Sequence, residues 1–135
     1  MKEKNMKCIQ RVLLSSVLVL LVVLVASVSA QDMKIAVPAV DSEPNASISK
    51  ETGRAPFFLF FDDKGHFLEA IQNPAKDQSG GVSRTVVALL TAHDINLIIA
   101  ESIGDKMKLA LIDHHIKIVN KTGTALDAVE AIIQN

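Results

Sequence analysis

Two short glycine-containing segments hold the residues best suited to contact a ligand. Gly53-Arg54 joins a conformationally permissive residue to a guanidinium group, which presents several N–H donors in a planar fork. Gly80-Gly81 stands directly before a predicted helix, where backbone N–H groups are available to an anion. Both segments therefore suit an anionic ligand. The alternative is that they are ordinary surface turns with a solvated arginine.

A third segment, Ser102-Ile103-Gly104, also lies between a predicted strand and a predicted helix. We expect Ser102 and Gly104 to border the same cleft as the first two segments. Within that cleft, we expect Arg54 to be the main electrostatic contact for the ligand, with its head group free and facing the Gly80-Gly81 turn. Arg54→Lys would keep the charge but lose the two-pronged donor set.

The other residues that could support chemistry do not form a recognisable catalytic or metal-binding pattern. The four histidines, His66, His93, His114 and His115, include no pair at the i, i+4 spacing of a helical metal site. The adjacent pair falls in a predicted turn, which favours solvated side chains over metal ligands. Glu69 is the one acid well inside a predicted strand, so a carboxylate cluster for Mg²⁺ is not expected. We therefore expect a protein that is not an enzyme.

The central structural element is the apolar run Phe57–Phe61, which holds four of the five phenylalanines of the chain. An unbroken apolar run of this length predicts a strand buried on both faces. Successive side chains of a strand point to opposite faces. Phe58 and Phe60 should therefore face one layer, and Leu59 and Phe61 should face the other.

The remaining elements follow from periodicity and turn signals. Asp63-Lys64-Gly65 predicts a hairpin after the phenylalanine strand, and Pro38 is expected to stop the first strand. Asp105 is a candidate N-cap, and Thr124 with Asp127 resembles a capping box. The polar segment 40–52 is expected to be a loop, either bordering the site or mobile at the surface. In chain order we expect strands at 33–37, 57–61, 66–73, 94–100 and 116–119, and helices at 82–92, 105–113 and 124–133.

This order, a hairpin followed by alternating strands and helices, predicts an α/β layered domain with a mixed sheet. Ligands of open sheets of this kind bind at the carboxyl ends of the parallel strands. The three glycine-containing segments follow or connect strands at that edge, so we expect them to meet there.

The first thirty residues have the composition of an export signal. Lys2, Lys4, Lys7 and Arg11 precede an apolar block, and Val28-Ser29-Ala30 provides the small residues of a cleavage site. We predict a signal peptide over residues 1–30 and a periplasmic or secreted domain over 31–135. The alternative is an uncleaved membrane anchor formed by residues 12–30, since a span of that length can cross a bilayer.

Composition limits the partners of the mature domain. Residues 31–135 carry ten Lys or Arg and fourteen Asp or Glu, a net charge of −4, without a basic run. Nucleic acid and anionic membrane surfaces are therefore not expected as partners, membrane contact being limited to an uncleaved N-terminal segment. The single cysteine, Cys8, lies in the predicted signal, so the mature domain has neither a disulfide nor a thiolate ligand for a metal.

Six short motifs, in this order and spacing, resemble the dinitrogenase iron–molybdenum cofactor biosynthesis family (NifX and NifB C-terminal-like domains). The resemblance covers residues 33–135. It implies a ribonuclease H-like three-layer α/β fold with a five-stranded mixed sheet. It also implies binding or carrying of an iron–sulfur or iron–molybdenum cluster precursor, rather than catalysis. The motifs lie at residues 33–38, 53–58, 73–74, 80–81, 98–104 and 116–119.

The sequence departs from the family at the residue expected to contact the cluster. Members commonly carry a histidine shortly before the Gly-Arg pair, and Glu51 stands in its place here. Glu51 therefore joins the predicted site, although a carboxylate is a hard ligand that matches a sulfide-rich cluster poorly. The expected function is an exported domain that binds a metal cluster or a small anionic ligand. The alternative is a structural or protein-interaction module that has kept the fold and lost the cluster site.

Overall fold

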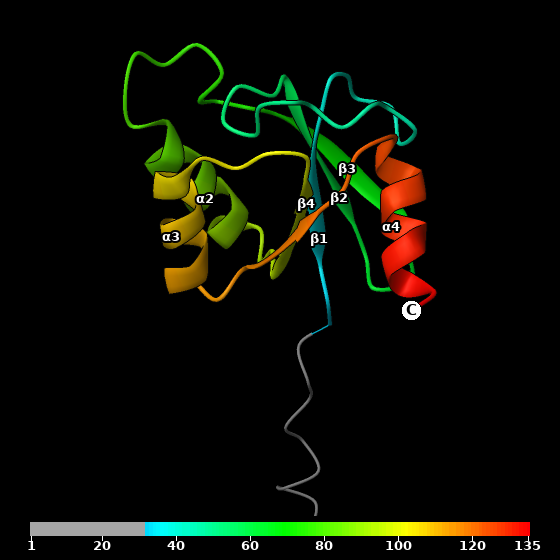
Figure 1. Cartoon of the computed structure of the whole chain (residues 1–135). Coiled ribbons are helices and arrows are strands. Elements are labelled where there is room, and N and C mark those ends of the chain that lie inside the picture. Colours follow the sequence, from blue (N-terminus) through cyan, green and yellow to red (C-terminus); the bar gives the residue numbers. More distant parts are fainter. Residues whose placement is uncertain (1–31) are drawn as a thin grey trace, which may run out of the picture. The chain divides into compact units, whose positions relative to one another are not determined.

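The computed structural model describes residues 32–135, which form one compact unit (Figure 1). The predictions for residues 1–30, a signal peptide or an anchor, lie outside the described residues. None of the helices within residues 32–135 is long and apolar enough to cross a membrane. The elements are β1 (Ile35–Ala39), β2 (Phe57–Phe61), β3 (Phe67–Gln72), α2 (Val82–Ala92), β4 (Leu97–Ala100), α3 (Asp105–Asp113), β5 (Lys117–Asn120) and α4 (Ala125–Ile133).

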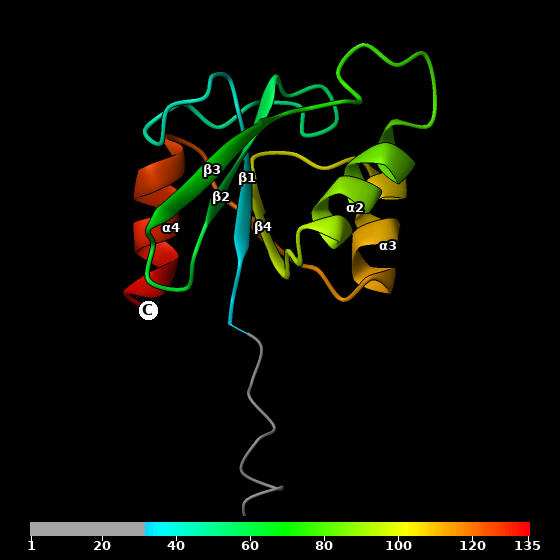
Figure 2. The ribbon, with the colours of Figure 1, turned by 180° about the vertical axis from the view of Figure 1, so that it is seen from behind.

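The five strands form one mixed sheet in the order β3-β2-β1-β4-β5. The pairs β1–β2 and β2–β3 are antiparallel, whereas β1–β4 and β4–β5 are parallel. Helices α2 and α3 cover one face of the sheet and α4 covers the other, as the opposite views of Figures 1 and 2 show. The predicted three-layer α/β fold with a five-stranded mixed sheet is confirmed.

Strand β2 is buried on both faces, as its apolar run predicts. Phe58 and Phe60 pack in the core under α2 and α3, and both are fully buried. Leu59 and Phe61 pack in the second core, under α4, and are equally buried. Since β2 lies inside the sheet between β1 and β3, its backbone is paired on both sides as well. The phenylalanine strand is thus the shared wall of the two cores.

Some boundary predictions were wrong for local reasons. Strand β4 begins at Leu97 and not at residue 94, because Asp94 and Ile95 still take part in the stop of α2. Strand β1 continues through Pro38 to Ala39. The carbonyl of Pro38 accepts from the N–H of Ser49, so the side of the strand that lacks a donor faces a loop and not β2. Helix α3 has Gly104 as its N-cap, and Asp105 is its first residue, without a side-chain capping bond. The carboxylate of Asp105 still lies in the first turn, where the helix dipole favours it.

The start of α4 is capped as predicted. The hydroxyl oxygen of Thr124 accepts a hydrogen bond from the N–H of Asp127, at an N–O distance of 3.4 Å. Only this half of the capping box is formed in the described structure. The side chains that α4 buries most completely are Ala125, Ala128 and Val129, whereas Leu126 and Ile133, expected on its inner face, are partly buried.

Helices α2 and α3 end in the same way. After α2, Asp94 donates its N–H to the carbonyl of Thr91, and Ile95 donates to that of Leu90. This is a Schellman motif, which requires a left-handed residue, and Asp94 accordingly has a φ of 57°. After α3, the N–H of Ile116 likewise bonds the carbonyl of Leu111, and the left-handed residue is His115, with a φ of 59°. The predicted turn at His114-His115 is therefore a helix stop.

The hairpin between β2 and β3 is organised by Asp62. One carboxylate oxygen, Oδ1, accepts from the N–H groups of Lys64 and His66 at 2.9 and 2.8 Å, and the other lies 3.1 Å from Nδ1 of His66. The N–H of His66, aided by that of Lys64 and by the charge of the imidazole, holds the pKa of Asp62 below its usual value. Gly65 has a φ of 84°, which the turn requires.

Candidate functional site at the carboxyl edge of the sheet

Strands β1, β4 and β5 all end at the same edge of the sheet, here called the carboxyl edge. Helices α2, α3 and α4 all begin there, and the loops 40–56, 73–81 and 101–104 lie over it (Figure 1). The predicted site residues Glu51, Gly53 and Arg54 lie on the first loop, Gly80 and Gly81 on the second, and Ser102 and Gly104 on the third. The fold thus places the three predicted segments at one edge of the sheet, where open α/β sheets bind ligands.

The first loop is fastened to the third by Thr52. Its hydroxyl donates to the carbonyl of Ser102 at 2.7 Å, and the Thr52 side chain is buried. Gly53 follows in a confined place, because a Cβ atom there would lie 2.8 Å from a methyl group of Val82 in α2 and 3.3 Å from Cε of Met107 in α3. A larger residue at position 53 would have to displace these two side chains. Gly53 therefore packs closely against both helices, which places Arg54 next to their starts.

Arg54 connects the first loop to the second. Its Nη1 donates to the carbonyl of Lys76 at 2.9 Å and to that of Gln78 at 2.7 Å. The expectation of a free head group was therefore wrong for this nitrogen, because it already satisfies two backbone oxygens of the second loop. The Arg54 residue itself is exposed, so the guanidinium lies at the surface of the carboxyl edge. Arg54 thus has a structural role in addition to any role in binding.

Asn73 completes the connection and was not predicted as part of the site. It is buried, and its Nδ2 donates to the carbonyls of Gly53 and Ala55 at 3.0 and 2.9 Å. Its Oδ1 accepts from the N–H of Ala75 at 2.9 Å. All of its side-chain bonds go to backbone groups of the two loops. The position was interpreted as the end of a strand before Pro74 and as part of one of the six family motifs, and neither interpretation predicts that its side chain is buried.

The segment 40–52 is held by backbone hydrogen bonds, so it is not a mobile surface loop. Its Ile48 donates to the carbonyl of Gly123 and pairs with Ala39, and Ala46 accepts from the N–H of Ala125. Ala46 and Ile48 are buried against α4 and the sheet. The loop therefore forms an ordered border of the carboxyl edge, as one of the two sequence-based interpretations expected.

The starts of α2 and α3 differ from the start of α4, which lies at the same edge. The N-caps of α2 and α3 are Gly81 and Gly104, and neither helix has a side-chain capping bond. Both glycines and Gly80 are exposed, and space is open around their Cα atoms. Gly81 has a φ of 72°, a conformation in which residues other than glycine are strained. The first N–H groups of these helices consequently have no side-chain acceptor in the described structure.

Glu51 and Ser102 are both exposed at the carboxyl edge. The backbone carbonyl of Glu51 accepts a hydrogen bond from the hydroxyl of Ser49 at 3.2 Å. The only ion pairs among residues 32–135 are those of His66 and His93, so none of them uses the carboxylate of Glu51. Glu51 is thus an available oxygen ligand or a negative charge next to the site.

Metal ligands are sparse throughout residues 32–135, where no group of three or more His, Cys, Asp or Glu side chains could hold a metal ion. None of the four histidines lies on the loops of the carboxyl edge. His66 is in the hairpin, and His93 and His114 cap the ends of α2 and α3. His93 packs on the Phe60 ring, with centroids 5.1 Å apart. The side chains of this edge suit anion binding through N–H groups better than direct coordination of a metal.

The fold has close counterparts among solved structures. The apo form of the orange protein from Desulfovibrio gigas has a TM-score of 0.71 at 22% identity, over 78% of this chain and 91% of its own. A putative NifB protein from Thermotoga has a TM-score of 0.66 at 22% identity, over 76% and 89%. A putative dinitrogenase from Methanocaldococcus jannaschii has a TM-score of 0.52 at 19% identity, over 78% and 91%. At these identities the similarity establishes the fold alone.

No curated protein matches the sequence significantly. The family model described as "Dinitrogenase iron-molybdenum cofactor" does match, over residues 33–135, which is the whole of the described domain except its first residue. This is the range over which the six motifs resemble that family. Because the match covers most of the chain and agrees with the three-layer fold, the chain belongs to the dinitrogenase iron–molybdenum cofactor family.

Proposed function

We propose that this protein is a binding domain that carries a metal cluster, or a small anionic metal complex, at the carboxyl edge, and that it is not an enzyme. The observation that carries the proposal is the convergence of the 51–54, 73–81 and 101–104 segments beside two helix starts that lack side-chain caps. Membership in the iron–molybdenum cofactor family supports a cluster as the cargo.

The available side chains limit how such a cargo would be held. A protein that coordinates an iron–sulfur cluster usually supplies thiolates, and residues 32–135 contain no cysteine. The cargo would therefore arrive with its own ligands complete. Its outer sulfur or oxygen atoms would accept hydrogen bonds from backbone N–H groups of the helix starts and from the nitrogens of Arg54 other than Nη1. Glu51 would repel the anion unless a cation lies between them.

Metal analysis of the protein purified anaerobically from its native host tests this function. We expect iron or molybdenum in stoichiometric amount, and Arg54→Ala should weaken the affinity for the cargo about tenfold, as expected for the loss of a charged hydrogen bond, and so lower the retained metal. Lys64→Ala removes one positive charge at the distant hairpin and should retain the metal. Metal-free wild-type protein, or equal retention by both variants, would contradict the proposed site.

A second pair of variants separates binding from loop structure. Arg54→Lys retains the charge but cannot match the two-pronged geometry, so bound metal should fall to an intermediate level. Glu51→His restores the residue common in the family, and we expect it to increase retention of an iron-containing cluster. Unfolding midpoints of all variants show whether a loss of metal is only a loss of loop structure.

The alternative, a structural or interaction module without a ligand, is favoured by one specific observation. Thr52, Arg54 and Asn73 bind backbone carbonyls across the carboxyl edge, so these side chains would be needed even if no ligand were bound. This alternative predicts that Arg54→Ala changes loop stability while the protein contains no metal before or after the substitution.

We also propose that the domain works outside the cytoplasm after cleavage between Ala30 and Gln31. The order of the basic residues, the apolar block and Val28-Ser29-Ala30 supports this proposal. Sequencing the N-terminus of the native protein should yield Gln31-Asp32. A native chain that begins at Met1 and fractionates with membranes would instead indicate an anchor.

A further inference from the structure

Strand β5 forms one outer edge of the sheet and is paired with β4 alone. Lys117 donates its N–H to the carbonyl of Asn96, and Lys121 donates to that of Ala100. Because backbone groups alternate in direction along a strand, the N–H and C=O groups of Ile118 and Asn120 point away from β4. Within residues 32–135, no loop or helix contributes a backbone bond to either of them. β5 is therefore open to another strand.

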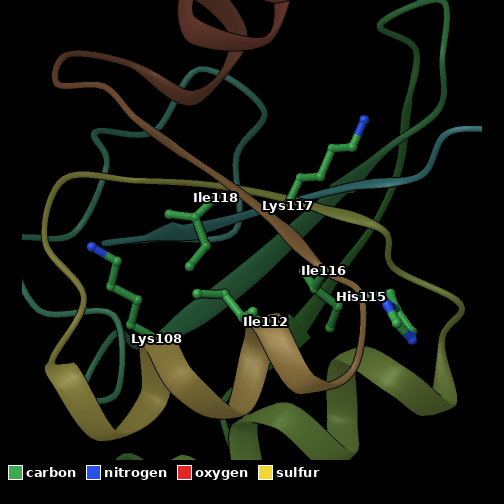
Figure 3. A pocket seen from close by; sticks show the side chains of 6 residues that line it. All are labelled: Lys108, Ile112, His115, Ile116, Lys117 and Ile118. Carbon is green, nitrogen blue, oxygen red and sulfur yellow. The ribbon is translucent and has the colours of Figure 1, made fainter.

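A groove lies on each face of the sheet beside this edge. On the α3 side, the groove has a volume of ≈ 490 Å³ and an apolar wall made by Ile112 of α3 and Ile118 of β5 (Figure 3). On the α4 side, the second groove has a volume of ≈ 410 Å³ and is lined by Val119 of β5 and Ile132 of α4, among others. Each groove can receive apolar side chains of an added strand.

The grooves carry positive charge in a domain that is negative overall. Lys108 lines the groove on the α3 side, and Lys117 lines both grooves. Figure 3 shows the amino group of Lys108 at one end of the α3-side groove, whereas the side chain of Lys117 points away from α3. No carboxylate lines either groove. The next residue after β5 is Lys121, which extends the positive strip along the edge.

We propose that the β5 edge binds an extended segment of another protein by strand addition, and that this segment has consecutive apolar residues flanked by carboxylates. The backbone of the segment would pair with Ile118 and Asn120. Successive side chains of a strand point to opposite faces, so neighbouring apolar residues would enter the α3-side and α4-side grooves in turn. The flanking carboxylates would then lie near Lys108, Lys117 and Lys121.

The same charges disfavour a second copy of the chain as the occupant. An antiparallel two-fold pairing that uses both sets of outward groups would place Ile118 of one copy opposite Asn120 of the other. In this register Lys117 would face Lys121 twice, and like charges directly opposite each other destabilise a sheet. A partner strand with acidic residues at these positions turns the repulsion into attraction.

The experiment measures binding of a fluorescent peptide to the full-length protein. The probe has a Val-Ile-Val centre between pairs of acidic residues, and its control has lysines in place of the acids. We expect saturable binding of the acidic peptide that weakens as salt increases, and no binding of the basic peptide. Absence of saturable binding at millimolar concentrations of the acidic peptide would overturn the proposal.

Two variants on the same helix test where the peptide binds. Ile112 is 54% exposed and lines the α3-side groove, whereas Leu109 is 66% exposed and does not line it. Ile112→Asp should weaken peptide binding about tenfold or more, and Leu109→Asp should leave it unchanged, because only the first puts a desolvated charge in the groove. Equal effects of the two substitutions would place the peptide elsewhere.

Ile118→Pro tests the backbone pairing. It removes an outward N–H together with the Ile118 side chain of the groove and leaves the bonds from β5 to β4 intact, so the protein should fold and the peptide should no longer bind. Ile118→Ala removes the same side chain but keeps the N–H, and it should retain more binding than Ile118→Pro. Sedimentation of the peptide-free protein supplies the other decisive result. A dimer that forms with increasing concentration and is lost in Ile118→Pro would assign the edge to a second copy and overturn the proposal.

Discussion

The two ends of helices α2 and α3 lie at opposite edges of the sheet and are finished in different ways. At the carboxyl ends of the helices, two Schellman motifs satisfy the last carbonyls, with Asp94 and His115 in the left-handed conformation. At the amino ends, Gly81 and Gly104 offer no side-chain acceptor to the first N–H groups. Helices α2 and α3 are thus capped at the edge of the sheet where they end, called the closed edge below. They lack side-chain caps at the carboxyl edge, where they begin, which is called the open edge below.

The loops show the same contrast. The hairpin at the closed edge is a tight turn around Asp62. The loops 40–56 and 73–81 at the carboxyl edge are longer, and Thr52, Arg54 and Asn73 fasten the loops of this edge to one another through backbone carbonyls. Side-chain bonds therefore hold the carboxyl edge in shape while its donors at the helix starts remain available. This difference is what makes the carboxyl edge the better candidate for binding.

The largest predicted effect concerns the buried middle of the sheet, between the two edges compared above. Phe58→Ala and Phe61→Ala each truncate a fully buried ring, one in each core, and each should lower the free energy of unfolding by about 3–5 kcal/mol. Chemical denaturation measures the loss. Phe67 is 38% exposed and serves as the control, and Phe67→Ala should lower the free energy of unfolding much less. A loss below about 1 kcal/mol at either buried position would mean that one layer does not cover the sheet.

The second prediction tests the side-chain bonds of the carboxyl edge. Asn73→Ala leaves the carbonyls of Gly53 and Ala55 and the N–H of Ala75 without their partner, and should lower the free energy of unfolding by about 2–3 kcal/mol. Asn45, an exposed residue of the 40–56 loop, is the control, and Asn45→Ala should be nearly neutral. Equal stability of the two variants would mean that the loops keep their shape without Asn73.

The sequence predicts the layers well because they depend on periodicity. The parity of Phe58 and Leu59 follows from alternation along a strand, and the bounds of helix α2 follow from its apolar face. The carboxyl-edge bonds depend on which distant backbone carbonyl a side chain meets. Thr52 binds Ser102, fifty positions away, and Arg54 binds Lys76 and Gln78. Such partners are set by the tertiary fold, and a single sequence carries no local signal for them.

The ends of helices α2 and α3 are a further feature that the sequence predicted only in part. The turn at His114-His115 was expected, but its physical reason was not, because Schellman motifs usually place glycine at the left-handed position. Here that position holds Asp94 after one helix and His115 after the other. The neighbouring apolar residues Ile95 and Ile116 secure both stops by packing in the core under α2 and α3.

The third prediction concerns the strain of the left-handed conformation of Asp94 at the closed edge. Asp94→Gly relieves a left-handed conformation that costs an ordinary residue about 1–2 kcal/mol, an advantage reduced by the greater freedom of glycine in the unfolded chain. We expect a net gain of about 0.5–1 kcal/mol in unfolding free energy, measured by denaturation. Gly81→Ala at the open edge is the matched opposite, since it places an alanine at a φ of 72° and should destabilise. Destabilisation by Asp94→Gly would mean that the Asp94 side chain supports the stop.

The smallest effect is the pH dependence of the hairpin at the closed edge. The N–H of His66 lowers the pKa of Asp62 in the folded protein, so the folded state binds a proton less readily than the unfolded chain does. The resulting stabilisation is fully present above the ordinary Asp pKa of about 3.9 and is lost as the pH falls through the lower folded value. An NMR titration should give the Asp62 carboxyl a pKa below its ordinary value, and Asp62→Asn should flatten the pH profile of stability in that acidic range.

Asp63, the exposed neighbour, is the control, and Asp63→Asn should leave the profile unchanged. If the two variants gave the same profile, the hairpin would not depend on the Asp62 carboxylate, and the closed edge would be held by its helix stops alone.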